Sequence, residues 1–192
     1  LGPGHVQEFY RGIPNCMVID SENEQVKRRL VQAFSSDLIR FYYGGDMIGN
    51  EVGAAAKNVV GIAAGFLDGV EMSSLKGALM SRGTREVARL IRAMGGNELS
   101  AYGLCHLGDY EATVFSPYSH NRQFGESFIR HQDYHRLAEG YYTVEALMVL
   151  SERYQVELPI CRAVHAILYE NADPREQLTE LLRRGLRAEF DD

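Results

Sequence analysis

The segment from Glu51 to Asp68, EVGAAAKNVVGIAAGFLD, is the feature that most restricts how this chain can fold. At the helical period of about 100° per residue, one face collects the bulkier apolar side chains Val52, Ala55, Ala56, Val59, Ala63 and Phe66. The other side carries small residues where a surface helix would carry Glu, Lys or Gln, namely Gly53, Ala54, Gly61, Ala64 and Gly65. The segment therefore predicts a helix over about 50–68 that is enclosed nearly all round.

Lys57 and Asn58 are the polar exceptions in the middle of this helix. Burial removes hydration from an ammonium group and lowers its pKa, toward the range in which a side chain exchanges protons at neutral pH. The small residues beside Lys57 would also let a ligand or another backbone approach closely. The helix pattern leaves two interpretations open. Lys57 is either a catalytic residue, or a structural lysine that reaches the rim or pairs with a buried carboxylate such as Asp109.

Helical patterns dominate the chain beyond this segment. They predict helices over about 74–95, 121–131, 143–155, 159–171 and 174–185. Pro159 and Pro174 stand in the first turns of the last two, where proline is well tolerated. Residues 96–120 form a long irregular segment, and loops of that length are usually functional or disordered.

The beginning of the chain has a different character, with strand patterns on either side of a helix. The elements expected are a helix from about Val6 to Tyr10, a strand from Cys16 to Ile19, a helix from a Ser21 to Glu24 capping box to about Phe34, and a strand from Leu38 to Tyr43. We therefore expect residues 1–45 to be the remnant of an α/β domain and residues 46–192 to form an all-helical domain. The expected fold class is mainly α.

Composition excludes several classes of partner. The chain has 192 residues, 45% of them hydrophobic, so it can bury a substantial core. Its formal net charge of -6 disfavours a protein that grips nucleic acid or an anionic membrane through excess Lys and Arg. The apolar run from Val59 to Leu67 is well short of the roughly 20 residues of a membrane-spanning helix.

The cysteines and the first residues bear on location. Cys16, Cys105 and Cys161 are far apart and show no metal spacing, which suits a reducing cytoplasm better than a disulfide framework. The opening Leu1-Gly2-Pro3-Gly4 has no basic and apolar leader, so we expect no signal peptide and a chain cut from something longer. We predict a cytoplasmic protein.

Polar residues gather around the irregular segment, in GLCHLGDYEATVFSPYSHNRQFG. Asp109 follows a turn between two glycines, and Ser119, His120, Asn121 and Arg122 stand where the next helix should begin. Such a helix start either binds a phosphate, through free amides and the helix dipole, or is an ordinary cap.

His131 and His135 are four residues apart but have no evident third ligand, so we expect no metal site. A GxGxxG run that follows a strand and opens a helix is also absent from these 192 residues, so the chain offers no recognisable dinucleotide cradle.

Several motifs together resemble one enzyme family. The runs EVGAAAKNVVGIAAGFLDGV, SRGTREVARLIRAMGG, GLCHLGD with Thr113, and SHNRQFG are similar in order and spacing to the C-terminal half of the NAD(P)-dependent glycerol-3-phosphate dehydrogenases. The early GPGHVQEFYRGIP and the late AEGYYTVEAL and VELPI extend the resemblance over essentially the whole chain. It implies a helical domain like that of 6-phosphogluconate dehydrogenase.

The resemblance also implies a reaction, which is the reversible reduction of dihydroxyacetone phosphate to sn-glycerol 3-phosphate with NADH or NADPH. Lys57 matches the catalytic lysine of the family. The positions that match substrate contacts are Gly2, Lys57, Asp109, Thr113, Ser119, His120 and Asn121. Those that match cofactor contacts are His120 and Glu139. The 192-residue chain by itself is expected to be inactive, because the nucleotide-binding domain and a second lysine are missing from it.

Two departures from the family pattern stand out. His120 replaces the arginine expected to touch both substrate phosphate and cofactor, and Gly4 replaces a Ser or Asn in the early turn. A neutral histidine largely forgoes a charge-assisted contact of about 1.5–3 kcal/mol, although Arg122 in the next turn could compensate.

These departures leave two other functions open. One is a non-catalytic helical module that dimerises or binds a phosphorylated metabolite, and the other is a related dehydrogenase that acts on a different hydroxy acid. The assembly is also open between a monomer and a homodimer, because either the domain itself or a partner subunit could enclose the helix over 50–68.

Overall fold

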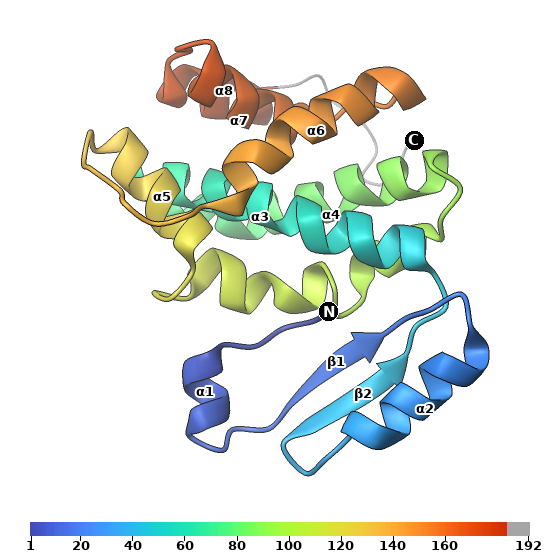
Figure 1. The fold of residues 1–192 in the computed structure, drawn as a ribbon. Coiled ribbons are helices and arrows are strands. Elements are labelled where there is room, and N and C mark those ends of the chain that lie inside the picture. Colours follow the sequence, from blue (N-terminus) through green and yellow to red (C-terminus); the bar gives the residue numbers. More distant parts are fainter. Residues whose placement is uncertain (184–192) are drawn as a thin grey trace.

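The computed structural model describes residues 1–183 and is mainly helical, with a small parallel sheet (Figure 1). The first elements are α1 (Val6–Tyr10), β1 (Asn15–Ile19), α2 (Glu24–Phe34) and β2 (Ile39–Tyr43). The two strands pair in parallel, from Asn15 opposite Ile39 to Ile19 opposite Tyr43, and α2 is the crossover between them. The expected α/β character of this part is confirmed.

The capping box predicted at the start of α2 is wrong. Asn23 is the N-cap, and its side-chain oxygen accepts from the Val26 amide at 3.1 Å. Ser21 instead accepts from the Asn23 amide at 3.2 Å, in the turn before the helix. Asn and Ser cap helices about equally well, and the chain path decided which of the two side chains reached the free amides.

The rest of the described chain is built around α3 (Met47–Gly69). The other α-helices of this part are α4 (Lys76–Ala93), α5 (His120–Ile129), α6 (Glu139–Tyr154), α7 (Pro159–Tyr169) and α8 (Pro174–Arg183). Every residue from Val59 to Leu67 is buried, because α4, α5, α6 and α7 all pack on α3. Figure 1 shows α3 and α4 in the middle, with α6, α7 and α8 on one side and the strands on the other. The predicted enclosure of this helix is confirmed.

Small residues let other backbones reach α3. A Cβ at Gly65 would collide with the Arg122 carbonyl of α5, and one at Gly125 would collide with the Ile62 carbonyl. A Cβ at Gly140, at the start of α6, would lie 2.6 Å from the Asn58 carbonyl. Glycine at positions 65, 125 and 140 therefore permits the close crossings of α5 and α6 with α3.

The predicted helices all occur, with shifted ends. The last helix was expected to reach residue 185, and that end lies outside the described residues. A short 3₁₀ turn, η1 (Ser73–Leu75), precedes α4. The irregular segment over 96–120 contains two further 3₁₀ turns, η2 (Glu98–Tyr102) and η3 (Leu107–Asp109), and the π-helical turn η4 (Glu111–Phe115). A search of the described part of the chain finds no helix with the length and apolar character that crossing a membrane requires.

Candidate active site

Lys57 and Asp109 form an ion pair between α3 and η3. The Lys57 side chain is 21% exposed and that of Asp109 only 3%. Burial lowers the pKa of the Lys57 ammonium, while electrostatic interactions with Cys105 and Glu139 oppose that change. The pairing that the sequence left open is therefore the one observed, and it leaves the lysine close to solvent on one side.

An amide network joins three helices beside this pair. Asn58 follows Lys57 on α3, donates to the Glu139 carboxylate at 3.2 Å and accepts from the Asn121 amide group at 3.1 Å. The Asn121 oxygen accepts from the Gly140 backbone amide at 2.9 Å. The beginnings of α5 and α6 are thereby fixed against the middle of α3.

Thr113 and Asn121 lie together beside Gly61, one turn beyond Lys57 on α3. A Cβ at Gly61 would be 2.9 Å from the Thr113 methyl and 3.1 Å from the Asn121 Cβ. Thr113 and Asn121 are both buried. The structure thus brings Lys57, Asp109, Thr113 and Asn121 to one stretch of α3.

Ser119 and His120 begin α5. Ser119 is the N-cap, and its hydroxyl accepts from the Arg122 amide at 3.3 Å. His120 is exposed at the first helical position, and Glu139 is exposed at the first position of α6. The capping role weighed for Ser119 is therefore observed, while the His120 and Glu139 side chains remain accessible to a ligand.

Arg122 does not replace the arginine missing at position 120. Its guanidinium donates to Asp68 at 2.8 Å, to Glu126 at 3.0 Å and to the Ser116 carbonyl at 3.2 Å. Asp68 also pairs with Lys76 at 2.6 Å. The compensation considered for Arg122 is wrong, because these carboxylates already neutralise its charge in a largely buried cluster.

Gly2 lies against β1. A Cβ there would be 3.0 Å from the Met17 Cα, and the backbone φ of 141° favours glycine. Neighbouring Leu1 exchanges backbone hydrogen bonds with Val18, at 3.0 and 2.7 Å. The contribution of Gly2 to a substrate site stays a prediction, and its position is fixed by the edge of the sheet.

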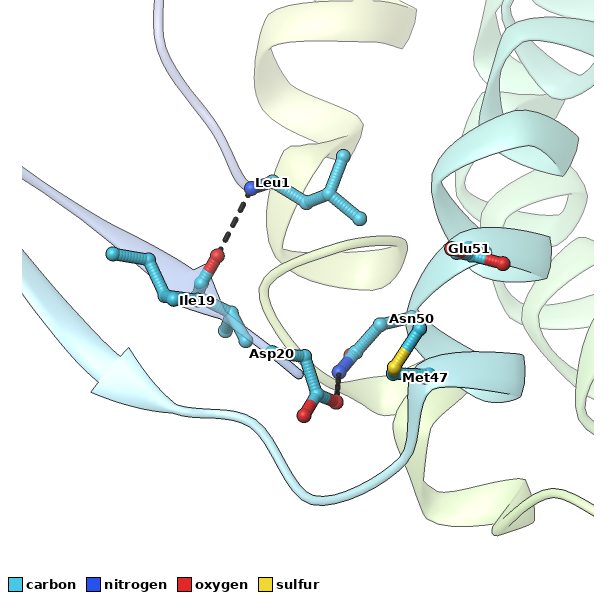
Figure 2. Close-up of a pocket in the computed structure, with 7 residues that line it drawn as sticks. Leu1, Ile19, Asp20, Met47, Asn50 and Glu51 are labelled. Atoms are coloured by element: carbon cyan, nitrogen blue, oxygen red, sulfur yellow. Dashed lines mark hydrogen bonds between the residues drawn. The ribbon is translucent and has the colours of Figure 1, made fainter. Parts of the chain in front are cut away.

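A cavity of about 270 Å³ lies where the strands end and α3 begins (Figure 2). Asp20 at its edge accepts from the Asn50 side chain at 2.8 Å and from the Asp46 amide at 2.9 Å. Nothing in the sequence pattern pointed to this cavity. Its lining residues are Leu1, Val18, Ile19, Asp20, Met47, Asn50 and Glu51.

The histidines divide into exposed and buried examples. His131 and His135 are exposed, and a search of residues 1–183 finds no group of three or more His, Cys, Asp or Glu that could hold a metal. His106 is fully buried next to the Asp109 turn. A lone histidine carries no signal in a sequence, so its burial is seen only in the structure.

Comparison with known proteins decides the family. A family model described as the C-terminus of NAD-dependent glycerol-3-phosphate dehydrogenase matches residues 46–179. The chain belongs to this family. The resemblance noted in its motifs and the expected mainly helical fold are both confirmed.

Curated relatives match over nearly the whole chain. A glycerol-3-phosphate dehydrogenase [NAD(P)+] of Thermus thermophilus is 39% identical over 98% of the chain and 60% of the relative. One of Fusobacterium nucleatum is 35% identical, over 98% and 59%. The chain therefore spans about 60% of the length of the relatives it matches.

Solved structures agree with the fold. The glycerol-3-phosphate dehydrogenase of Coxiella burnetii superposes with a TM-score of 0.90 at 32% identity, over 95% of this chain and 59% of that one. The Plasmodium falciparum glycerol-3-phosphate dehydrogenase gives 0.80 at 17% identity, over 97% and 56%, and this likeness concerns the fold alone.

Proposed function

We propose that this chain is the substrate-binding and catalytic part of an NAD(P)-dependent glycerol-3-phosphate dehydrogenase, which reversibly reduces dihydroxyacetone phosphate to sn-glycerol 3-phosphate. The observation that carries the proposal is the Lys57–Asp109 pair in a largely buried setting, beside an amide network. Residues 46–192 would form the substrate domain and residues 1–45 the end of a nucleotide-binding domain.

Lys57 would act as the general acid. When bound, the nicotinamide cofactor supplies the hydride that reaches the carbonyl carbon. The carbonyl oxygen then takes a proton from the Lys57 ammonium, which leaves a neutral amine and an alcohol. Because burial lowers the Lys57 pKa, giving up this proton is easier than for an exposed lysine. In the reverse direction the neutral amine accepts the alcohol proton.

Asp109 would hold the Lys57 ammonium in position and leave some of its N–H donors free. An ammonium has three N–H donors, and the Asp109 carboxylate accepts one, so the others can face a substrate oxygen. Thr113 and Asn121 would line the same pocket, and Ser119 and His120 would lie near the phosphate at the start of α5, where the helix dipole favours an anion. Gly2 would complete the pocket through its backbone.

The exposed side chains at the edge of this site fit a nucleotide. Glu139 is held by Asn58, and a carboxylate there can accept hydrogen bonds from ribose hydroxyls. His120 is exposed on the neighbouring helix start. Glu139 and His120 would therefore contact the cofactor, as the resemblance to the family implies.

A metabolite-binding module without catalysis is the second candidate, favoured by His120 in place of the arginine expected there. The buried Lys57 opposes it, since burying a cation costs stability that binding alone would not require.

One experiment separates the two. Dihydroxyacetone phosphate reduction is measured with both cofactors in the complete product of the gene that encodes this chain, alongside Lys57→Ala, and binding of the same compound is measured by calorimetry. Turnover that Lys57→Ala abolishes supports the dehydrogenase. Binding without turnover supports the module, and turnover only with another hydroxy acid would reassign the substrate.

A further inference from the structure

His106 lies fully buried between α3 and the turn that carries Asp109. Its Nδ1 is 2.8 Å from the Gly53 carbonyl oxygen on α3. Its Nε2 is 2.6 Å from the Tyr110 hydroxyl, and the two rings meet edge to face with centroids 4.8 Å apart. Tyr110 is also fully buried. Both ring nitrogens are therefore satisfied without solvent.

The partners fix the state of the imidazole. A carbonyl oxygen only accepts, so Nδ1 must carry the hydrogen that it donates to Gly53. Nε2 then accepts from the Tyr110 hydroxyl. Burial lowers the pKa of His106 to about 4, and the charge of nearby Lys57 acts in the same direction. His106 is neutral at physiological pH, with one defined tautomer.

The two contacts connect the two halves of the catalytic pair. Gly53 stands one helical turn before Lys57, and in an α-helix its carbonyl also accepts from the Lys57 amide. Asp109 stands between His106 and Tyr110 in sequence, and its amide donates to the His106 carbonyl at 3.0 Å. The imidazole thus joins the turn that bears the carboxylate to the helical turn that bears the ammonium.

The approach of this turn to the helix depends on glycine. A Cβ at Gly53 would lie 3.1 Å from the His106 Cβ, closer than such contacts normally come. The imidazole therefore packs directly on the α3 backbone, where a small shift of His106 would move Asp109 relative to Lys57.

We propose that neutral His106 is a positioning residue that, through its bond to Gly53, holds the Asp109 carboxylate against the Lys57 ammonium. The catalytic meaning of this role rests on the proposed dehydrogenase function, whereas the positioning itself does not. The alternative is that His106 only fills the core.

The direct readout is the pKa of Lys57. The chain has three lysines, Lys27, Lys57 and Lys76, so lysine labelled with ¹³C at Cε gives a simple spectrum, and Lys57→Arg assigns the signal. The titratable groups that face Lys57 are Asp109, Glu139 and Cys105, and the neutral His106 imidazole lies near it. Asp109→Asn calibrates the full effect of losing the carboxylate, which lowers the Lys57 pKa further.

Three variants test the two hydrogen bonds of His106 separately. His106→Leu removes both, His106→Asn keeps an N–H near the position of Nδ1, and Tyr110→Phe removes only the hydroxyl. We expect His106→Leu to shift the Lys57 pKa in the same direction as Asp109→Asn and by at least half as much. In His106→Asn the Lys57 pKa should lie close to its wild-type value. Tyr110→Phe should give a smaller shift, because the imidazole loses one of its two anchors.

A buried hydrogen bond elsewhere supplies the control. Ser151 is buried and donates to the Val156 carbonyl at 2.6 Å, so Ser151→Ala should lower the melting temperature without moving the Lys57 signal.

The outcomes are distinct. If His106→Leu and Tyr110→Phe destabilise the chain but leave the Lys57 pKa at its wild-type value, His106 is only a core residue and the proposal fails. It also fails if His106→Asn shifts the pKa as far as Leu does. If His106→Leu does not fold, Tyr110→Phe and His106→Asn decide in the same way. Failure of the wild type to bind dihydroxyacetone phosphate would overturn the proposed function instead, since the titration uses no substrate.

Discussion

Asp109→Asn removes the negative charge that faces Lys57 and nearly preserves the volume of the side chain. The Lys57 side chain is 21% exposed, so most of it would stay out of water without its partner. Breaking a buried ion pair by removing one member costs about 3–5 kcal/mol. Lys57 can limit this cost by losing its proton. From an ordinary pKa of 10.5, that loss at pH 7 costs about 5 kcal/mol, at about 1.36 kcal/mol per unit. Because the lysine is partly exposed, we expect a destabilisation of about 3 kcal/mol.

The loss should also depend on pH. In Asp109→Asn the folded-state pKa of Lys57 lies further below its unfolded value, so the folded protein binds fewer protons than the unfolded chain. Stability then rises with pH across the window between those two values. The destabilisation relative to wild type should shrink as the pH rises from the folded-state pKa of Lys57 in the variant toward that in wild type, by at most about 1.4 kcal/mol per pH unit.

Urea unfolding measures both effects. The chain has no Trp, so far-ultraviolet circular dichroism is the suitable signal. A double-mutant cycle with Lys57→Met isolates the coupling between the two residues, since the double variant buries neither charge. A destabilisation below about 1 kcal/mol that stays constant with pH would show that water already screens the pair, and the catalytic geometry inferred from it would be refuted.

Three further predictions concern the site and its scaffold. In the complete gene product, Lys57→Ala should lower kcat for dihydroxyacetone phosphate reduction by at least about 100-fold, because the general acid is lost, and steady-state kinetics with retained circular dichroism checks this. His120→Arg should tighten dihydroxyacetone phosphate binding about ten-fold or more in calorimetry, as a charge-assisted contact of about 1.5–3 kcal/mol is added; unchanged affinity would place the phosphate elsewhere. Gly65→Ala should destabilise the chain by about 1–3 kcal/mol, because its Cβ meets the Arg122 carbonyl. Gly77→Ala, where a Cβ meets nothing within 4 Å, should instead be stabilising or neutral in the same thermal melts.

The central helix was predictable because its composition reports its surroundings directly. A helix that has small residues where a surface helix has charged ones must be covered by other elements. In the structure four helices pack on α3. Lys57 was identifiable for the same reason, as a cation in an otherwise apolar helix. The pairing with Asp109 could be suggested but not fixed, because it depends on how a turn more than fifty residues away folds back.

Other features could not be predicted from the sequence because they depend on where a side chain points in the fold and not on the residue type. Arg122 stands next to Asn121 in sequence, yet its side chain contacts Asp68 near the end of α3 and Glu126 one turn further along α5, and not Asn58. His106 has no periodicity or spacing that distinguishes it from an incidental core histidine. The start of α6 at Glu139 was also missed, since the helical pattern of that segment becomes clear only further along the chain.

The distribution of charge around the site restricts how it can hold a phosphate. Lys57 faces Asp109, Arg122 faces Asp68 and Glu126, and Lys76 also pairs with Asp68. Each of these largely buried cations is paired with a carboxylate and not held free for an incoming dianion. The attraction must then come from the helix N-termini at His120 and Glu139, each worth typically about 0.3–1 kcal/mol, and from His120 itself. An arginine at position 120 would place an unpaired positive charge beside the helix dipole of α5, which the paired cations do not supply. The residue at this position should therefore control substrate affinity, while Lys57 and Asp109 control the rate of the chemical step.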